Sequence, residues 1–132
     1  MEQIPPSFHD LFERESFASF ATVMPDGTPQ VTPVWIDFDG EFVLVNTAKG
    51  RQKDRNVREN PAVGVLVMDP DDPYRYVSIR GTVAEVTEDG ATAHIDSLAQ
   101  RYMDVEEYPH HGEERGPRVL IKIRPDRVVT SA

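Results

Sequence analysis

Apolar runs along the chain, some alternating with polar positions and some continuous, predict a mainly β protein with a few short helices. The expected strands cover residues 17–24, 30–37, 41–46, 62–67, 76–88 and 118–124. Apolar residues near helical spacing predict a helix over residues 90–102, with one face on the sheet. A variant of the capping box at Ser7 predicts an earlier helix as far as Arg14. Strands outnumber helices, so a β-sheet is expected to form the core.

Glycine and proline residues divide the predicted strands. The Pro-Asp-Gly sequence ending at Gly27 predicts a tight turn, and Gly40 predicts a second. Gly81 lies inside the long segment 76–88, which is therefore expected to bulge or bend. Pro33 cannot donate a hydrogen bond to a ladder, so its strand is expected at the edge of the sheet or at a bulge.

The basic residues gather in one segment of an otherwise acidic chain. Of fourteen Lys and Arg residues, five lie within ten positions, namely Lys49, Arg51, Lys53, Arg55 and Arg58. The chain has 23 Asp and Glu residues and a formal net charge of -9, and Arg14 is the only basic residue before this segment. The field of the whole molecule would repel a nucleic acid backbone, so the cluster favours a small anionic ligand.

The residues around this cluster are typical of a helix start that binds an anion. Gly50 allows a tight exit from strand 41–46, and residues 52–60 can form about two helical turns before a proline ends them. The free N–H groups of the first turn would lie beside Arg51 and Lys53, where they favour a phosphate. The alternative is a solvated helix between two strands, which is the ordinary role of a charge run.

Composition restricts the other classes of protein. A chain of 132 residues with 39% hydrophobic residues can bury one modest core, so one domain over residues 1–132 is expected. An apolar run of about 18 residues and a signal-like amino terminus are both lacking, which predicts a cytoplasmic protein without a membrane span. The absence of cysteine excludes disulfides and thiolate chemistry. The four histidines lack the spacing of metal ligands, so no metal site is predicted.

Residues 21–35, 46–61 and 76–83 carry an ordered set of motifs. Their order resembles the split-barrel flavin-binding family, which includes pyridoxamine 5'-phosphate oxidase, the flavin reductases and the deazaflavin (coenzyme F420)-dependent reductases. The likeness extends from about Phe17 to Val129. The middle segment contains Asn-Thr-x-x-x-Arg-x-Lys-x-Arg-Asn. This string is similar to the one that holds the cofactor phosphate in the small F420-type members.

The resemblance implies a six-stranded split β-barrel that forms a homodimer, with a cofactor at each of two subunit interfaces. It implies that the strand with Pro33 lies along the cofactor ring, and that Tyr74 and Tyr76 reach the partner subunit's cofactor. Ordinary edge and packing roles are the alternatives for these residues. The expected cofactor-binding residues are Gln30, Thr32, Pro33, Val34, Asn46, Thr47, Ala48, Arg51, Gln52, Lys53, Arg55, Asn56, Tyr74 and Tyr76.

By the same resemblance, the chain is expected to be an oxidoreductase that uses reduced F420 to transfer hydride to an unsaturated small organic substrate. Lys49, Arg55 and Arg58 would be superfluous for the single phosphate of FMN and useful for the longer anionic tail of F420. An FMN flavoprotein and a non-catalytic F420 carrier are the alternatives. No catalytic side chain is predicted, because the cofactor carries the chemistry in such enzymes.

Two further expectations concern the substrate. Loops such as residues 103–117 are expected to build its pocket. The chain ends soon after its last predicted strand, without the carboxy-terminal segment that grips pyridoxal phosphate in true pyridoxamine phosphate oxidase. Vitamin B6 oxidation is therefore not expected.

Overall fold

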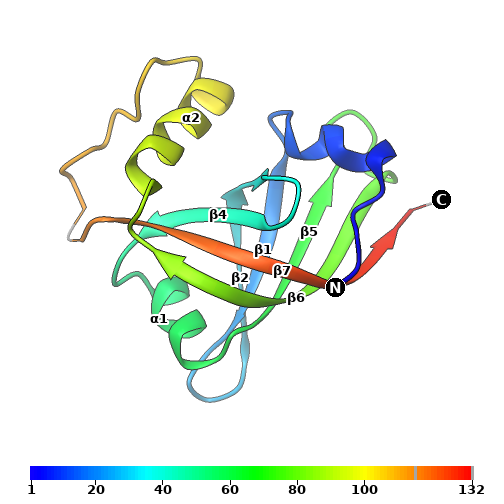
Figure 1. The fold of residues 1–132 in the computed structure, drawn as a ribbon, viewed down its shortest axis with the longest axis horizontal. Helices are drawn as coiled ribbons and strands as arrows, with labels where there is room; N and C mark the ends of the chain where they lie inside the picture. The colour runs from blue at the N-terminus through cyan, green and yellow to red at the C-terminus, as the bar shows by residue number, and fades with distance from the viewer. Residues whose placement is uncertain (115, 132) are drawn as a thin grey trace.

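Strands dominate the computed structural model, which describes residues 1–114 and 116–131 (Figure 1). A 3₁₀ helix, η1 (Pro6–Phe12), lies near the amino terminus. The strands are β1 (Phe17–Val23), β2 (Pro29–Trp35), β3 (Asp37–Phe38), β4 (Val43–Ala48), β5 (Ala62–Met68), β6 (Tyr76–Thr87) and β7 (Arg118–Thr130). The α-helices are α1 (Gln52–Glu59) and α2 (Ala91–Met103). The prediction of a mainly β protein is confirmed.

The strands form one antiparallel sheet in the order β2-β1-β5-β6-β7-β4-β3, and the sheet curls into a half-barrel (Figure 1). The described residues therefore form seven strands rather than the six expected. The additional strand is β3, which the sequence pattern did not separate from β2. Pro33 lies on β2 at the edge of the sheet, as its missing N–H group requires.

The break between β2 and β3 occurs at Ile36, whose backbone groups bond to α2 instead of a neighbouring strand. The Ile36 N–H group donates to the Tyr102 hydroxyl at 3.1 Å, and its carbonyl accepts from Arg101 at 2.8 Å. Tyr102 also donates to the Ser16 carbonyl at 2.5 Å. Arg101 extends further to the Asp37 carboxylate at 3.0 Å. Helix α2 thus holds the two edge strands of the curled sheet together.

Strand β7 continues well beyond Arg124, where the sequence pattern predicted its end. Pro125, which follows, has no N–H group to donate to a neighbouring strand. In the structure Pro125 lies opposite Gly81, where the register between β6 and β7 shifts and a residue without an N–H group is tolerated. A Cβ atom on Gly81 would lie 2.7 Å from the Arg124 carbonyl oxygen, so the strands pass too closely for any side chain. The predicted bulge at Gly81 is confirmed.

The first helix differs in type from the one predicted. Pro5 occupies its N-cap without a side-chain hydrogen bond, and the helix is of the 3₁₀ kind. Pro6 lies at the first helical position, so Ser7 falls inside the first turn and cannot cap it. The segment still buries Leu11 and Phe12 against the sheet.

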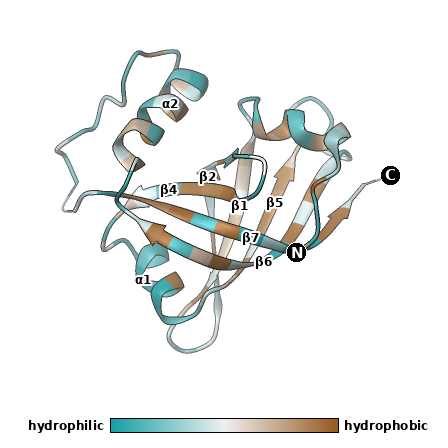
Figure 2. Cartoon of the chain, in the orientation of Figure 1, coloured by the Kyte–Doolittle hydropathy of each residue, from teal (hydrophilic) through white to brown (hydrophobic). Residues whose placement is uncertain are grey.

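Apolar residues follow the strands around the half-barrel and form its core (Figure 2). A smaller cluster of Leu44, Ala91 and Leu120 fixes α2 to β4 and β7. Leu44 points away from the barrel core, because Val43 and Val45 on either side of it belong to the core. Helix α2 therefore packs on the outer face of β4, and this position makes it a wall of the site described next.

Candidate functional site

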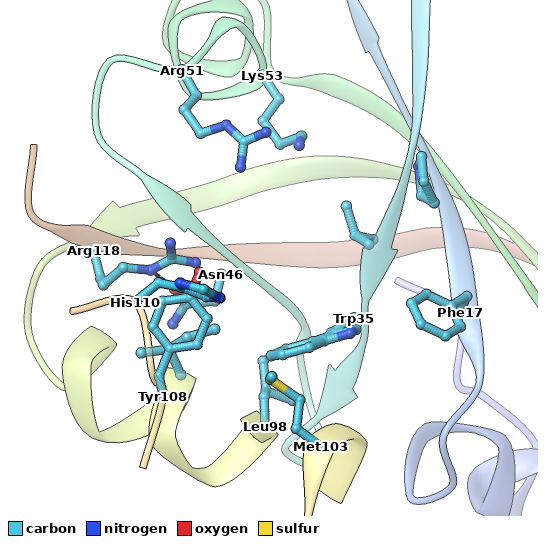
Figure 3. Close-up of a pocket in the computed structure, with 13 residues that line it drawn as sticks. Phe17, Trp35, Asn46, Arg51, Lys53, Leu98, Met103, Tyr108, His110 and Arg118 are labelled. Carbon is cyan, nitrogen blue, oxygen red and sulfur yellow. Dashed lines mark hydrogen bonds between the residues drawn. The ribbon is translucent and has the colours of Figure 1, made fainter. Parts of the chain in front are cut away.

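A cavity of about 360 Å³ opens where β2, β4, β7 and both α-helices meet (Figure 3). The loop after α2 completes its wall. The lining residues are Phe17, Pro33, Val34, Trp35, Asn46, Arg51, Lys53, Ile95, Leu98, Met103, Tyr108, His110 and Arg118. Arg51 and Lys53 lie in one part of this surface and Trp35 in another, while Arg118 lies beside Tyr108 (Figure 3). The cavity is thus suited to a ligand with both an anionic group and a flat apolar part.

Lys53 is a buried cation that faces other cations. Only 8% of Lys53 is exposed, although the residue lies in the first turn of α1. Burial lowers the pKa of the Lys53 ammonium group, and the nearby charges of Arg51 and Arg118 lower it further. Among residues 1–114 and 116–131, no carboxylate forms an ion pair with Lys53 or Arg51. An anionic ligand would supply the missing negative charge.

The backbone at the start of α1 adds uncapped donors to this positive region. Gly50 has a φ of 94°, which the tight exit from β4 requires and which glycine adopts without strain. Arg51 is the N-cap and has extended dihedral angles, but no side chain caps the first turn. The Asp54 carboxylate accepts from the Gly50 N–H group at 2.8 Å instead. Helix α1 thus begins beside Arg51 and Lys53 without a side-chain cap on its first turn, as the sequence predicted.

Aromatic rings form the flat part of the cavity. Trp35 stacks on Tyr102 with ring centroids 5.0 Å apart and an angle of 7° between their planes. Tyr108, in the loop after α2, places its edge against Trp35. The Arg118 guanidinium lies 5.2 Å from the centre of the Tyr108 ring. Such a surface can pack against a planar ring system.

Arg118 is held at the cavity wall by two neighbours. Its Nε–H group donates to Asn46 Oδ1 at 2.8 Å, and its NH1 group donates to Glu114 at 2.6 Å. Burial raises the pKa of the nearby Tyr108 hydroxyl, and the Glu114 charge adds to the rise. Tyr108 therefore remains a neutral phenol at physiological pH.

A second cavity lies on another side of α1, against the turn between β1 and β2. Its lining residues are Val23, Met24, Pro25, Gly27, Gln52, Arg55, Asn56, Glu59 and Asn60. The Asn56 side chain is buried and donates to the Thr22 hydroxyl at 3.0 Å. Arg55 is exposed and donates to the Gln52 side chain.

The structure separates the fourteen expected cofactor-binding residues into three groups. The main cavity is lined by Pro33, Val34, Asn46, Arg51 and Lys53. The second cavity is lined by Gln52, Arg55 and Asn56. Neither cavity is lined by Gln30, Thr32, Thr47, Ala48, Tyr74 or Tyr76.

Residues of the third group point away from both cavities for different reasons. Thr47 follows Asn46 on β4 and therefore points to the opposite face, into the barrel. Its buried hydroxyl finds no hydrogen-bond partner within the described part of the chain. Tyr74 is 86% exposed in the loop before β6. The expected role of Tyr74 and Tyr76 in a partner's site stays a prediction.

Several lining residues were not among the expected ones, and Arg118 is the most important. In the sequence Arg118 is only a basic residue at the start of an apolar strand, and nothing near it indicates a site. Tyr108 and His110 belong to the loop that was expected to build the substrate pocket, and Trp35 completes the set. The described residues contain no group of three or more His, Asp or Glu side chains arranged to hold a metal ion. None of the helices described is long and apolar enough to cross a membrane.

The curled antiparallel sheet is of the split-barrel kind. The chain matches the family model of pyridoxamine 5'-phosphate oxidase over residues 4–132. The chain therefore belongs to the pyridoxamine 5'-phosphate oxidase-like family of split-barrel proteins, as the motifs in the sequence predicted.

Solved structures show the same relationship. An F420 reductase is 39% identical, with a TM-score of 0.82 and coverage of 96% of this chain and 98% of that chain. A conserved hypothetical protein from Mycobacterium tuberculosis is 26% identical, with a TM-score of 0.77 and coverage of 99% and 86%. HupZ from Group A Streptococcus is 21% identical, with a TM-score of 0.69 and coverage of 96% and 93%, and shares the fold.

Proposed function

We propose that the protein is an F420H2-dependent oxidoreductase that transfers hydride to an unsaturated small organic substrate. The family model and the similarity to an F420 reductase support an oxidoreductase-like protein with a flavin-type cofactor. The observation that carries the proposal is Lys53, a buried cation without an ion-pair partner in the described residues. Its ammonium group lines a cavity that also offers a flat aromatic wall.

The residues of the main cavity fit such a cofactor. Arg51, Lys53 and the uncapped first turn of α1 would bind its phosphate, because they offer charge-assisted hydrogen bonds to one anion. Pro33 and Trp35 would contact its ring system and keep water away from it. When bound and reduced, a deazaflavin supplies a hydride. The protein contributes the position of the cofactor and the charges and contacts that hold it.

The charges that were expected to favour F420 over FMN are mostly paired. Lys49 bonds to Glu88 at 3.2 Å, and Arg58 bonds to Asp54 at 2.9 Å. Arg55 has no ion-pair partner in residues 1–114 and 116–131, and it lines the second cavity. The second cavity would therefore receive an anionic tail through Arg55. The pairing of Lys49 and Arg58 favours the alternative, an FMN flavoprotein of the same family.

Competitive titration tests the choice of cofactor. We expect F420 to bind more tightly than FMN at low salt, with a modest difference that shrinks at moderate salt, because exposed ion pairs contribute about 0–1 kcal/mol each. Arg55→Ala should weaken F420 binding and leave FMN binding unchanged. Arg127→Ala removes an exposed arginine that lines neither cavity and should change neither affinity.

The outcomes of this titration separate the alternatives. Tighter binding of FMN than of F420 at both salt concentrations contradicts the F420 assignment and favours the flavoprotein. Tight F420 binding without reduction of any enone or quinone favours a carrier of the cofactor.

The proposal includes a homodimer that shares its cofactor sites. Phe17 on β1 and Val31 on the edge strand β2 are each 61% exposed, and burial of such apolar surface favours association. We expect light scattering at micromolar concentration to give a mass near twice the 14.9 kDa of the chain. A monomer in the presence of bound cofactor would remove the shared site and the role proposed for Tyr74 and Tyr76.

A further inference from the structure

A chain of hydrogen bonds connects the cavity wall to the edge strand β3 through His94 of α2. The Asn46 side-chain amide donates to His94 Nδ1 at 3.1 Å and to the Ala91 carbonyl at 2.8 Å. His94 Nε2 lies 3.0 Å from the Asp37 carboxylate. At the other end, Asn46 Oδ1 accepts from Arg118 at 2.8 Å. Of these residues, Asn46 and Arg118 line the main cavity, whereas Asp37 and His94 do not.

The chemistry of the neighbours determines where the protons lie. The Arg118 guanidinium can only donate, so the oxygen of the Asn46 amide faces it. The Ala91 carbonyl can only accept, so the nitrogen of that amide faces α2. The amide therefore presents N–H groups to His94 Nδ1, which must accept. The imidazole then carries its proton on Nε2 and donates it to Asp37.

The partners at β3 favour this arrangement. Burial raises the pKa of the Asp37 carboxyl, but hydrogen bonds from His94 and Arg101 outweigh burial and the net shift is downward. Asp37 therefore remains an anion that accepts from His94 Nε2–H. The charged groups facing the imidazole are Asp37 from β3 and Arg101 from α2, and β7 contributes Arg118 beyond the Asn46 amide.

We propose that His94 is a positioning residue: as a neutral imidazole with its proton on Nε2, it fixes the Asn46 amide and through it the Arg118 guanidinium at the cavity wall. A second proton on Nδ1 would face the N–H groups of Asn46 and break this contact. If the amide then turned over, its nitrogen would face the Arg118 guanidinium, which cannot accept. Binding of an anionic ligand through Arg118 should therefore weaken as His94 becomes protonated. The last statement rests on the proposed function, whereas the proton assignment does not.

The first test needs no ligand. Long-range ¹H–¹⁵N spectra at pH 8 should show the Nε2–H tautomer of His94. In His94→Phe the Asn46 amide loses its hydrogen bond to His94 and is held less firmly against Arg118. The Arg118 Nε–H group should then exchange with solvent about tenfold faster. His94→Asn should restore slow exchange, since its side-chain oxygen can take the place of Nδ1. An Nδ1–H tautomer, or unchanged exchange in His94→Phe, would overturn the proposal.

The second test uses F420 titrated by fluorescence between pH 5.5 and 8. The affinity of the wild type should fall on the acid side more steeply than the affinity of His94→Asn, which cannot titrate. At pH 8, His94→Phe should bind about tenfold more weakly and His94→Asn within about twofold of the wild type. His9→Asn, which removes a histidine outside both cavities, should keep the wild-type profile.

The two tests distinguish the positioning role from the proposed cofactor. Absence of F420 binding to the wild type contradicts the proposed function, and the exchange of Arg118 Nε–H then decides the role of His94 alone. Equal acid-side losses in the wild type and His94→Asn would contradict the role of His94 in binding. Circular dichroism of each variant separates these effects from a loss of folding.

Discussion

Lys53→Met should bind the cofactor about 10–150-fold more weakly than the wild type, which corresponds to roughly 1.5–3 kcal/mol. Methionine keeps most of the volume of lysine but removes the charge that Arg51 and Arg118 face across the cavity. The lost interaction is a charge-assisted hydrogen bond in a buried setting, where solvent and salt screen it little. Titration of F420 and FMN into both proteins measures the difference.

The same substitution should not lower the stability of the protein without ligand. The lowered pKa of Lys53 means that the unfolded chain binds this proton more strongly than the folded chain does. The charged lysine therefore costs free energy below its folded pKa, and the cost declines as the pH rises toward the ordinary value of 10.5. Lys53→Met should unfold at the same or a higher temperature than the wild type at pH 7, with a difference that shrinks at alkaline pH.

Arg127→Ala provides the matched control for the binding measurement. Arg127 is exposed near the other end of β7 and lies 3.7 Å from Glu2, so its removal should leave cofactor affinity unchanged. If the affinity of Lys53→Met is unchanged as well, the basic segment is a solvated helix and not a binding site for the cofactor. A clear fall in the unfolding temperature of Lys53→Met would mean that the ammonium group stabilises the fold.

Arg101→Ala should lower the free energy of unfolding by about 2–4 kcal/mol, because hydrogen bonds to a charged group are among the stronger ones. The guanidinium donates to the carbonyls of Phe12 and Ile36 at 2.7 and 2.8 Å, and to Asp37 at 3.0 Å. Its removal leaves two carbonyls and a partly buried carboxylate without this donor. Urea denaturation monitored by circular dichroism measures the loss.

Ser97→Ala is a suitable comparison for this experiment, because Ser97 is exposed on the same helix. Its unfolding free energy should stay within about 0.5 kcal/mol of the wild type. A similarly small effect of Arg101→Ala would show that α2 does not hold the edge strands together.

The elements that the sequence predicted well are those determined by neighbouring residues. The bulge at Gly81, the edge position of Pro33 and the helix start after Gly50 each follow from the backbone properties of one residue. The helix α1 begins at Gln52 and ends within one residue of its predicted end. The break at Ile36 was missed because its backbone partners come from α2, more than sixty residues later in the chain.

The candidate site shows the same division. Arg51 and Lys53 could be predicted because they belong to one short motif. Arg118 could not, because its place in the cavity depends on a hydrogen bond to Asn46, which lies 72 residues earlier. Tyr108 joins the wall through contact with Trp35, which no local pattern indicates. Side chains brought together by strand pairing are not visible in the spacing of residues along the chain.

The two edge strands of the sheet are neighbours in sequence, and α2 contacts both the junction between them and the cavity. Arg101 and Tyr102 in its last turn bond to the backbone of Ile36, between β2 and β3, while Ile95 and Leu98 of the same helix line the cavity. A shift of α2 that broke its bonds to Ile36 would therefore also change the shape of the cavity. Substitutions at this junction can in this way alter ligand preference without any contact with the ligand.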